Sequence, residues 1–216
     1  MSSDFLLGKT FYVMRHAETD DNLKKIASGS GREAQLTENG KGQAISAGDI
    51  VEKLENKITN VVTSAMQRTQ ETGKIVCDRD SLRHIPHSVD KGINERVYGA
   101  MEGFSEKRRR EFKKVGGVVD GEESKENLRE RTVGAIKQNL EDGKTPLFVT
   151  HGGNVLRMVG EALGGERVID AIKKKGRVAG NCALYEFITP AKNGEKWQVN
   201  LLTLDKDKQV ERSPVG

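Results

Sequence analysis

The segment K-T-F-Y-V-M-R-H-A-E-T, residues 9–19, joins a short apolar run to an arginine and a histidine. Its first part, residues 9–14, is β-prone and starts directly after Gly8, so it predicts a buried strand. Arg15 and His16 stand where that strand ends. Because open α/β sheets bind ligands at the carboxyl ends of their strands, this junction is a candidate binding site.

The regions on either side of this segment alternate between strand-like and helix-like patterns. Short apolar runs predict further buried strands at residues 60–64 and 146–150. Partial alternation predicts two late strands at a sheet edge, at 182–189 and 197–204. Helical spacing predicts helices over about 37–55, 65–77, 124–141 and 154–163, with Thr37 and Ser124 as N-caps. This alternation predicts an α/β fold, a three-layer α/β/α sandwich with a mostly parallel central sheet.

The length of 216 residues fits one domain, residues 1–216. Residues 100–122 interrupt the alternation with the basic run Lys107–Arg110 and then Gly116-Gly117, and we interpret them as a short charged insertion that acts as a lid. Residues 205–216 are polar and predict a loose tail.

Composition excludes several classes of protein. With 36 basic and 32 acidic residues the net charge is +4, which does not separate a phosphate ester from nucleic acid as the ligand. Aromatic residues make up only 5% and no nucleic-acid motif occurs, so no nucleic-acid partner is expected. No apolar stretch approaches the roughly 20 residues of a membrane span, so no membrane partner is expected either. Two cysteines and no recognisable signal peptide favour the cytoplasm, and the oligomeric state is not indicated.

Polar residues follow each of the three predicted parallel strands. Asn22 comes after the first, Arg68 after the second, and His151 with Gly152 after the third. In a parallel sheet these groups meet at one edge, although 135 positions separate His16 from His151. Two histidines and two arginines at one edge predict a phosphate site that contains a nucleophile.

The chemistry of such a set is coherent. A phosphoryl group carries about two negative charges near neutral pH, and the planar guanidinium of arginine matches its oxygens. A nucleophilic imidazole must be neutral, and neighbouring cations favour the neutral form, so we assign this role to His16. The leaving alkoxide needs a proton, for which Glu95 is the best candidate and Glu18 the rival. A metal site is not predicted, because His84 and His87 lack further ligands at a suitable spacing.

The motif R-H-A-E-T at 15–19 resembles the signature of the histidine phosphatase superfamily, in its phosphoglycerate mutase-like branch. The similarity continues through residues 36–44, 64–69, 121–124 and 150–153 and covers roughly 10–190. It implies a phosphoglycerate mutase-like fold, no metal, and phosphorylation of a histidine. The catalytic residues by this resemblance are Arg15, His16, Arg68, Glu95 and His151, and the candidate substrate-binding residues are Asn22, Ser28, Gly29, Arg96, Tyr98 and Gly152.

The resemblance leaves the reaction open. Phosphoglycerate mutases of this type carry a long insertion between the acid and the second histidine, whereas only 55 residues lie between Glu95 and His151 here. The pair Glu95-Arg96 with Tyr98 is nevertheless similar to the mutases. We expect a phosphatase that hydrolyses phosphomonoesters, either small molecules or a phosphoprotein. The alternatives are a mutase primed by 2,3-bisphosphoglycerate and an inactive phosphate-binding module, against which the intact His16, Glu95 and His151 argue.

Overall fold

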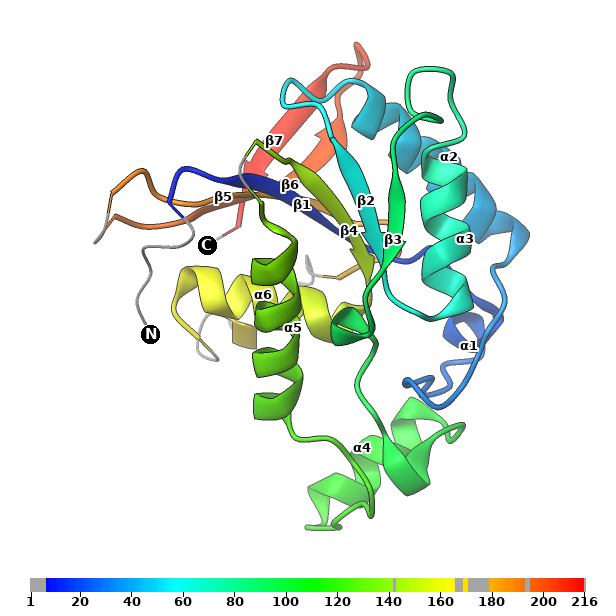
Figure 1. Ribbon diagram of the computed structural model, residues 1–216. Coiled ribbons are helices and arrows are strands. Elements are labelled where there is room, and N and C mark those ends of the chain that lie inside the picture. The colour runs from blue at the N-terminus through cyan, green and yellow to red at the C-terminus, as the bar shows by residue number, and fades with distance from the viewer. Residues whose placement is uncertain (1–6, 142, 166–168, 171–178, 193–194, 216) are drawn as a thin grey trace.

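A seven-stranded mixed sheet runs through the computed structural model, which describes residues 7–141, 143–165, 169–170, 179–192 and 195–215 (Figure 1). The strands lie in the order β3-β2-β4-β1-β5-β6-β7. Their bounds are β1 Thr10–Arg15, β2 Asn60–Thr63, β3 His87–Val89, β4 Pro146–Thr150, β5 Leu184–Ile188, β6 Gln198–Leu204 and β7 Val210–Pro214. The predicted strands at 60–64 and 146–150 are therefore confirmed.

Parallel pairing is confined to one half of the sheet. β3, β2, β4 and β1 pair in parallel, whereas β5, β6 and β7 each pair antiparallel with the strand before them in the sheet order. The predicted α/β class is confirmed, and the sheet is mixed. The parallel half brings the carboxyl ends of β1, β2 and β4 to one edge, as the site prediction requires.

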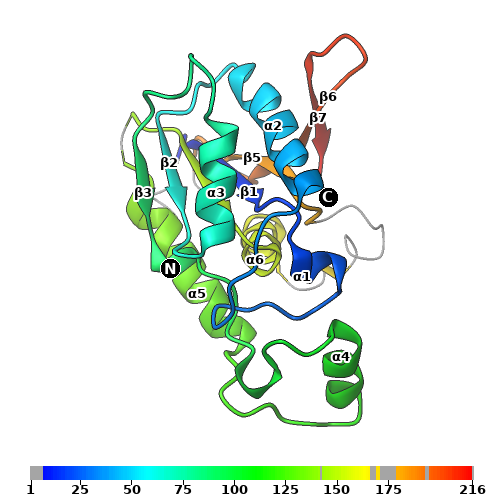
Figure 2. The same ribbon diagram turned by 90° about the vertical axis from the view of Figure 1, so that its right-hand side faces the viewer.

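Helices cover both faces of the sheet (Figures 1 and 2). The α-helices are α1 Asp20–Leu23, α2 Glu38–Glu52, α3 Gln67–Val76, α4 Glu106–Lys114, α5 Lys125–Asn139 and α6 Gly152–Leu163, with short 3₁₀ turns η2 Lys91–Ile93 and η3 Gly99–Met101. Side chains alternate along β1, so Tyr12 and Met14 join the core under α2 and α3, while Phe11 and Val13 join the core under α5 and α6. One core lies on each face of the sheet, so helices, sheet and helices form three layers.

Two of the helix starts follow from capping residues in the sequence. The side chains of Thr37 and Ser124 accept hydrogen bonds from the amides of Gly40 and Asn127, which confirms both predicted N-caps. The helix after β4 starts at Gly152, two residues earlier than predicted, with His151 at the N-cap position. No described helix is both long and apolar enough to cross a bilayer.

The predicted charged insertion, residues 100–122, contains α4 and all of η3 except its first residue, Gly99. Ser105 caps α4 by accepting from the amide of Arg108. Figure 2 shows α4 set apart from the sheet, on the side of α1 and the lower end of α5. The action of this segment as a lid stays a prediction.

The predicted loose tail is wrong for residues 210–214 of the range 205–216. Val210–Pro214 forms β7, which pairs with β6 from Asn200↔Pro214 to Leu204↔Val210. The Nε of Arg212 donates to the fully buried Glu186 carboxylate on β5, at 2.9 Å. A polar strand at an edge faces water on its outer side, so its composition resembles that of a tail although its backbone is paired.

Candidate active site

A cavity of about 170 Å³ lies at the carboxyl ends of the parallel strands. It receives residues from the end of β1, from α1, α3, α4 and α6, and from the loops after β1 and η2. Its lining residues are Arg15, His16, Thr19, Asn22, Ile26, Ala27, Ser28, Arg68, Glu95, Tyr98, Glu106, Arg109, Gly152, Gly153, Leu156 and Ala179. Side chains from residues 15 to 179 thus meet at one place, as parallel pairing predicts.

His16 is held in one tautomer by its own backbone neighbourhood. Its Nδ1 lies 2.7 Å from the carbonyl oxygen of Ala17, and a carbonyl can only accept, so Nδ1 carries the proton. The other ring nitrogen, Nε2, then has a lone pair. Burial first, and then the charges of Arg15 and Arg68, lower the pKa of His16 well below its ordinary value. His16 is therefore a neutral imidazole with Nε2 as the nucleophilic atom.

His151 packs against His16 from the end of β4. The two ring centroids are 5.2 Å apart with an interplanar angle of 62°, and His151 is fully buried. Its Nε2 lies 2.9 Å from the Ser64 hydroxyl, whereas its buried Nδ1 has no hydrogen-bond partner among the described residues. Burial and the charge of Arg68 lower the pKa of His151 well below its ordinary value. A buried polar atom without a partner, placed beside a nucleophile, is a candidate ligand contact.

The two arginines are positioned by carbonyl oxygens. Arg15 donates from an Nη to the carbonyl of Ala179 at 2.6 Å, and its buried Nε has no partner in the described part of the chain. Arg68, 1% exposed, donates to the carbonyls of Ser28, Gly29 and Arg32. Carbonyl contacts fix both guanidinium groups without neutralising them. The cavity therefore combines two cations with the His16 nucleophile.

Asn22 is oriented within the first helical turn after β1. The Thr19 amide donates to Asn22 Oδ1 and the Asn22 amide donates to the Thr19 hydroxyl, which together form a capping box for α1. Because Oδ1 accepts, the side-chain amide NH₂ of Asn22 remains as a donor at the cavity.

Glu95 is one of two carboxyl residues, with Glu106, among the described residues that line the cavity. It is 7% exposed, lines the cavity, and accepts from its neighbour's amide, Arg96 N, through Oε1 at 2.8 Å. The Arg131 guanidinium donates to the backbone carbonyl of Glu95 at 2.9 Å and so fixes the loop that carries it. The rival acid Glu18 instead accepts from Thr37 and is not among the lining residues.

The N-terminus of α6 also faces the cavity through Gly152 and Gly153. His151 provides no side-chain cap there, so the first amides of α6 are available to an anion. A Cβ on Gly153 would lie 2.5 Å from Glu95 Oε1, so only glycine leaves that carboxylate in place.

α4 forms the outer wall of the cavity. The Arg109 guanidinium stacks on the Tyr98 ring, 4.0 Å from its centroid, and both residues line the cavity. Arg96, Arg109 and Lys113 surround the single carboxylate of Glu122. The Glu95 charge, followed by burial, raises the pKa of Tyr98, so its phenol stays protonated. This wall is more basic than acidic.

Most of the residues predicted for the site come together. Arg15, His16, Asn22, Ser28, Arg68, Glu95, Tyr98 and Gly152 line the cavity, and His151 contacts His16. Gly29 and Arg96 are not among the lining residues. The Gly29 amide donates to Glu102, and the Nε of Arg96 donates to the carbonyl of Glu123. Both residues support the loops around the cavity.

Two residues that no sequence motif indicated, Asn181 and Arg131, contact the site from distant parts of the chain. Asn181 donates to the carbonyl of His16 and to Asn22 Oδ1, and Arg131 fixes the Glu95 loop. Neither belongs to a local pattern. Asn181 comes close to His16 because β5 lies inside the sheet, antiparallel to β1, a placement that differs from the sheet edge predicted for the late strands.

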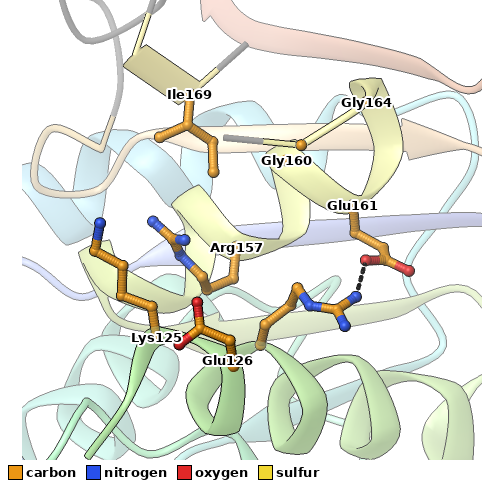
Figure 3. A pocket seen from close by; sticks show the side chains of 9 residues that line it. Lys125, Glu126, Arg157, Gly160, Glu161, Gly164 and Ile169 are labelled. Atoms are coloured by element: carbon orange, nitrogen blue, oxygen red, sulfur yellow. Dashed lines mark hydrogen bonds and ion pairs between the residues drawn. The ribbon is translucent and has the colours of Figure 1, made fainter. Parts of the chain in front are cut away.

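A second cavity, of about 400 Å³, lies between α5 and α6 (Figure 3). Charged side chains from the two helices meet there, and Arg129 pairs with Glu161 at 2.7 Å. It is larger than the first cavity, yet its described lining residues include no imidazole, hydroxyl or thiol side chain. The chemistry therefore favours the smaller cavity as the active site. No cluster of three potential metal-ligating side chains occurs among the described residues.

Comparison with known proteins agrees with this geometry. Residues 11–201 match the histidine phosphatase superfamily (branch 1). The chain belongs to this superfamily. It is similar to a 2,3-bisphosphoglycerate-dependent phosphoglycerate mutase of Bartonella quintana, with 30% identity over 99 residues, which are 46% of this chain and 48% of that protein. The predicted resemblance is therefore confirmed, although the match spans about half the length of that relative.

Two further comparisons concern a curated protein and a solved structure. A broad-specificity phosphatase of Saccharomyces cerevisiae is 25% identical over 157 residues, covering 68% of this chain and 67% of that protein. The crystal structure of phosphoglycerate mutase from Bacillus anthracis superimposes with a TM-score of 0.73 at 17% identity, covering 99% of this chain and 95% of that one. The last similarity confirms the phosphoglycerate mutase-like fold.

Proposed function

We propose that this protein is a phosphatase that hydrolyses phosphomonoesters through a phosphohistidine on His16. The observation that carries the proposal is the neutral His16 ring, with its Nδ1 proton bound to Ala17 and its Nε2 free, beside the cations Arg15 and Arg68. Superfamily membership supports phosphoryl transfer in general.

In the first step Nε2 of His16 attacks the phosphorus atom, the N–P bond forms, and the ester P–O bond breaks. Arg15, Arg68 and the NH₂ of Asn22 hold the equatorial oxygens, where charge accumulates in the transition state. The unpartnered Nδ1 of His151 is available as a further contact. Arg15 and Arg68 supply the positive charge, so this step requires no metal ion.

Glu95 serves both steps. As a carboxylic acid it gives its proton to the leaving alkoxide, and as a carboxylate it then takes a proton from water, which attacks phosphorus. The N–P bond breaks, phosphate leaves, and His16 returns to the neutral state. The position of Glu95 on the cavity wall supports this role over Glu18.

The alternative is a phosphoglycerate mutase primed by 2,3-bisphosphoglycerate. It is favoured by the pair Glu95-Arg96 with Tyr98 and by the mutase relatives. A mutase must keep water from the phosphohistidine. The segment between η3 and α5 contains one nine-residue helix, α4. Such a short segment is poorly suited to shield a phosphohistidine from water. We therefore favour hydrolysis, with a small phosphate ester or a phosphoprotein as substrate.

A panel of phosphomonoesters with detection of inorganic phosphate tests the proposal, with His16→Ala as the matched inactive control. Release by the wild type and none by the variant supports the phosphatase. Rapid isomerisation of 3-phosphoglycerate with a trace of 2,3-bisphosphoglycerate, without phosphate release, identifies a mutase instead. Phosphate binding without either reaction identifies an inactive binding module.

A further inference from the structure

Residues 179–183, which we call the strap, contact three of the candidate phosphate-binding residues. The carbonyl of Ala179 accepts from Arg15 at 2.6 Å. The Nδ2 of Asn181 donates to the His16 carbonyl at 3.1 Å and to Asn22 Oδ1 at 3.0 Å. The strap then continues into β5, the antiparallel neighbour of β1. One short segment thus ties together groups that follow β1.

The hydrogen-bond network fixes the orientation of the Asn181 amide. The His16 carbonyl can only accept. Asn22 Oδ1 must also be an acceptor, because the Thr19 amide already donates to it at 3.2 Å. Both contacts therefore require the NH₂ group of Asn181, which has two protons to give. With its Oδ1 held by Thr19 and Asn181, the Asn22 side chain can only turn its own NH₂ away from them, as a donor at the cavity.

The backbone of the strap is strained. Ala179 and Cys182 have φ values of 66° and 54°, in the left-handed region that residues with a Cβ rarely adopt. Such conformations persist where the surrounding contacts determine them, and they cluster at functional sites. Here the contacts are those to Arg15, His16 and Asn22.

We propose that Asn181 is a positioning residue for phosphoryl transfer, which acts by orienting the Asn22 amide and the backbone of His16. The proposal rests on the proposed function of the same site. Asn181 is absent from the cavity lining, so its effect is indirect. Loss of its amide leaves the Thr19 amide as the remaining donor to Asn22 Oδ1. It also removes one of the two donors to the His16 carbonyl in the described part of the chain, the other being the Cys182 amide at 3.4 Å.

A double-mutant cycle with Asn22 tests this inference. We expect Asn181→Ala to lower kcat/KM about tenfold, as the loss of one or two neutral hydrogen bonds predicts. Because Asn181 acts largely through Asn22, the double variant with Asn22→Ala should fall no more than about twofold below the lower single variant. Multiplication of the two single effects in the double variant would overturn the proposal. Asn39→Ala, which removes an exposed amide bound to Glu18, is the control and should retain full activity.

Asn181→Asp provides a second readout that a purely structural role would not move. The introduced carboxylate faces two acceptor oxygens, whereas its protonated form can donate to one of them. The ratio of variant to wild-type kcat/KM should therefore rise as the pH falls, and a ratio independent of pH would contradict the proposal. This isosteric variant also replaces Asn181→Ala in the cycle if the alanine variant does not fold.

Binding of inorganic phosphate separates failure of this inference from failure of the proposed function. Calorimetric titration of the wild type and the same variants needs no turnover. If the wild type binds phosphate but hydrolyses no ester, the proposed function is wrong, and the cycle is evaluated on phosphate affinity instead. Equal phosphate affinity in the wild type and Asn181→Ala would then reject the positioning role.

Discussion

Gly153→Ala should damage catalysis while leaving the fold intact. A Cβ at this position would lie 2.5 Å from Glu95 Oε1, and real Cβ atoms essentially never approach closer than 3.0 Å. The carboxylate must therefore retreat by at least about 0.5 Å, because helix α6 holds the new methyl group in place. This movement disturbs the 2.8 Å bond from the Arg96 amide that orients Glu95.

The expected magnitude follows from the role of Glu95 as the acid. Misplacing a catalytic group by about 1 Å costs on the order of 100-fold in rate, or about 2.7 kcal/mol. We expect a loss of this order for an alkyl phosphate, whose alkoxide needs a proton to leave. For p-nitrophenyl phosphate, whose phenolate leaves without one, only a few-fold loss is expected.

Stability should change little, because alanine is favoured over glycine in a helix by up to about 1 kcal/mol, while the Leu128 methyl at 3.3 Å must yield slightly. The assay compares kcat/KM for both esters with urea denaturation of each protein. Gly42→Ala, also within a helix but with no atom within 4 Å of the new Cβ, is the control. Equal losses on both esters, or none on either, would refute the placement of Glu95 as the acid.

Three other perturbations test the site and the sheet. His16→Ala should abolish the acid-labile phosphoenzyme formed from labelled substrate, and label retained on the variant would remove His16 from its role. The pKa values of His16 and His151 are lowered well below 6.5 in the folded protein, so below that pH the unfolded chain binds more protons than the folded one. The free energy of unfolding should therefore fall on acidification by up to about 1.4 kcal/mol per pH unit for each of the two histidines. His151→Asn should weaken this pH dependence, as measured by acid titration followed by circular dichroism. Arg212→Ala removes the cation beside the buried Glu186 carboxylate and should cost about 2 kcal/mol in urea denaturation, less than a fully buried pair because Arg212 is partly exposed. An unchanged midpoint would show that this ion pair does not stabilise the sheet.

The sequence predicted those parts of the site that follow a strand. Arg15, His16 and His151 stand directly after apolar runs, and a parallel sheet brings such positions together whatever their separation in the chain. Arg68 was predicted in the same way, since α3 begins just after β2. Periodicity and capping residues predicted α2 and α5 for the same reason, because both signals are local.

The remaining features depend on contacts without a local signal. Asn181 lies 165 positions from His16, and nothing in residues 179–183 indicates a contact with it. The polar sequence of β7 did not indicate a strand, because backbone hydrogen bonds to β6 suffice to hold an edge strand and require no apolar face. An arginine such as Arg96 can bind phosphate, yet the Nε of Arg96 donates to the Glu123 carbonyl. The orientation of this side chain follows from the three-dimensional structure and not from the sequence.

The hydrogen bonds of Arg68 have a consequence for how anionic ligands stabilise this protein. Main-chain carbonyls surround its buried guanidinium, and in the described part of the chain no carboxylate forms an ion pair with Arg68 or Arg15. The ligand-free protein therefore holds two cations at one cavity, Arg68 buried and Arg15 partly exposed, and the nearby charge of Glu95 offsets their mutual repulsion only in part. A tetrahedral dianion relieves that repulsion, so melting experiments should report occupancy directly, with about 2.7 kcal/mol of added stability at one hundred times Kd. Screening compounds by thermal shift would then identify ligands before any reaction is known.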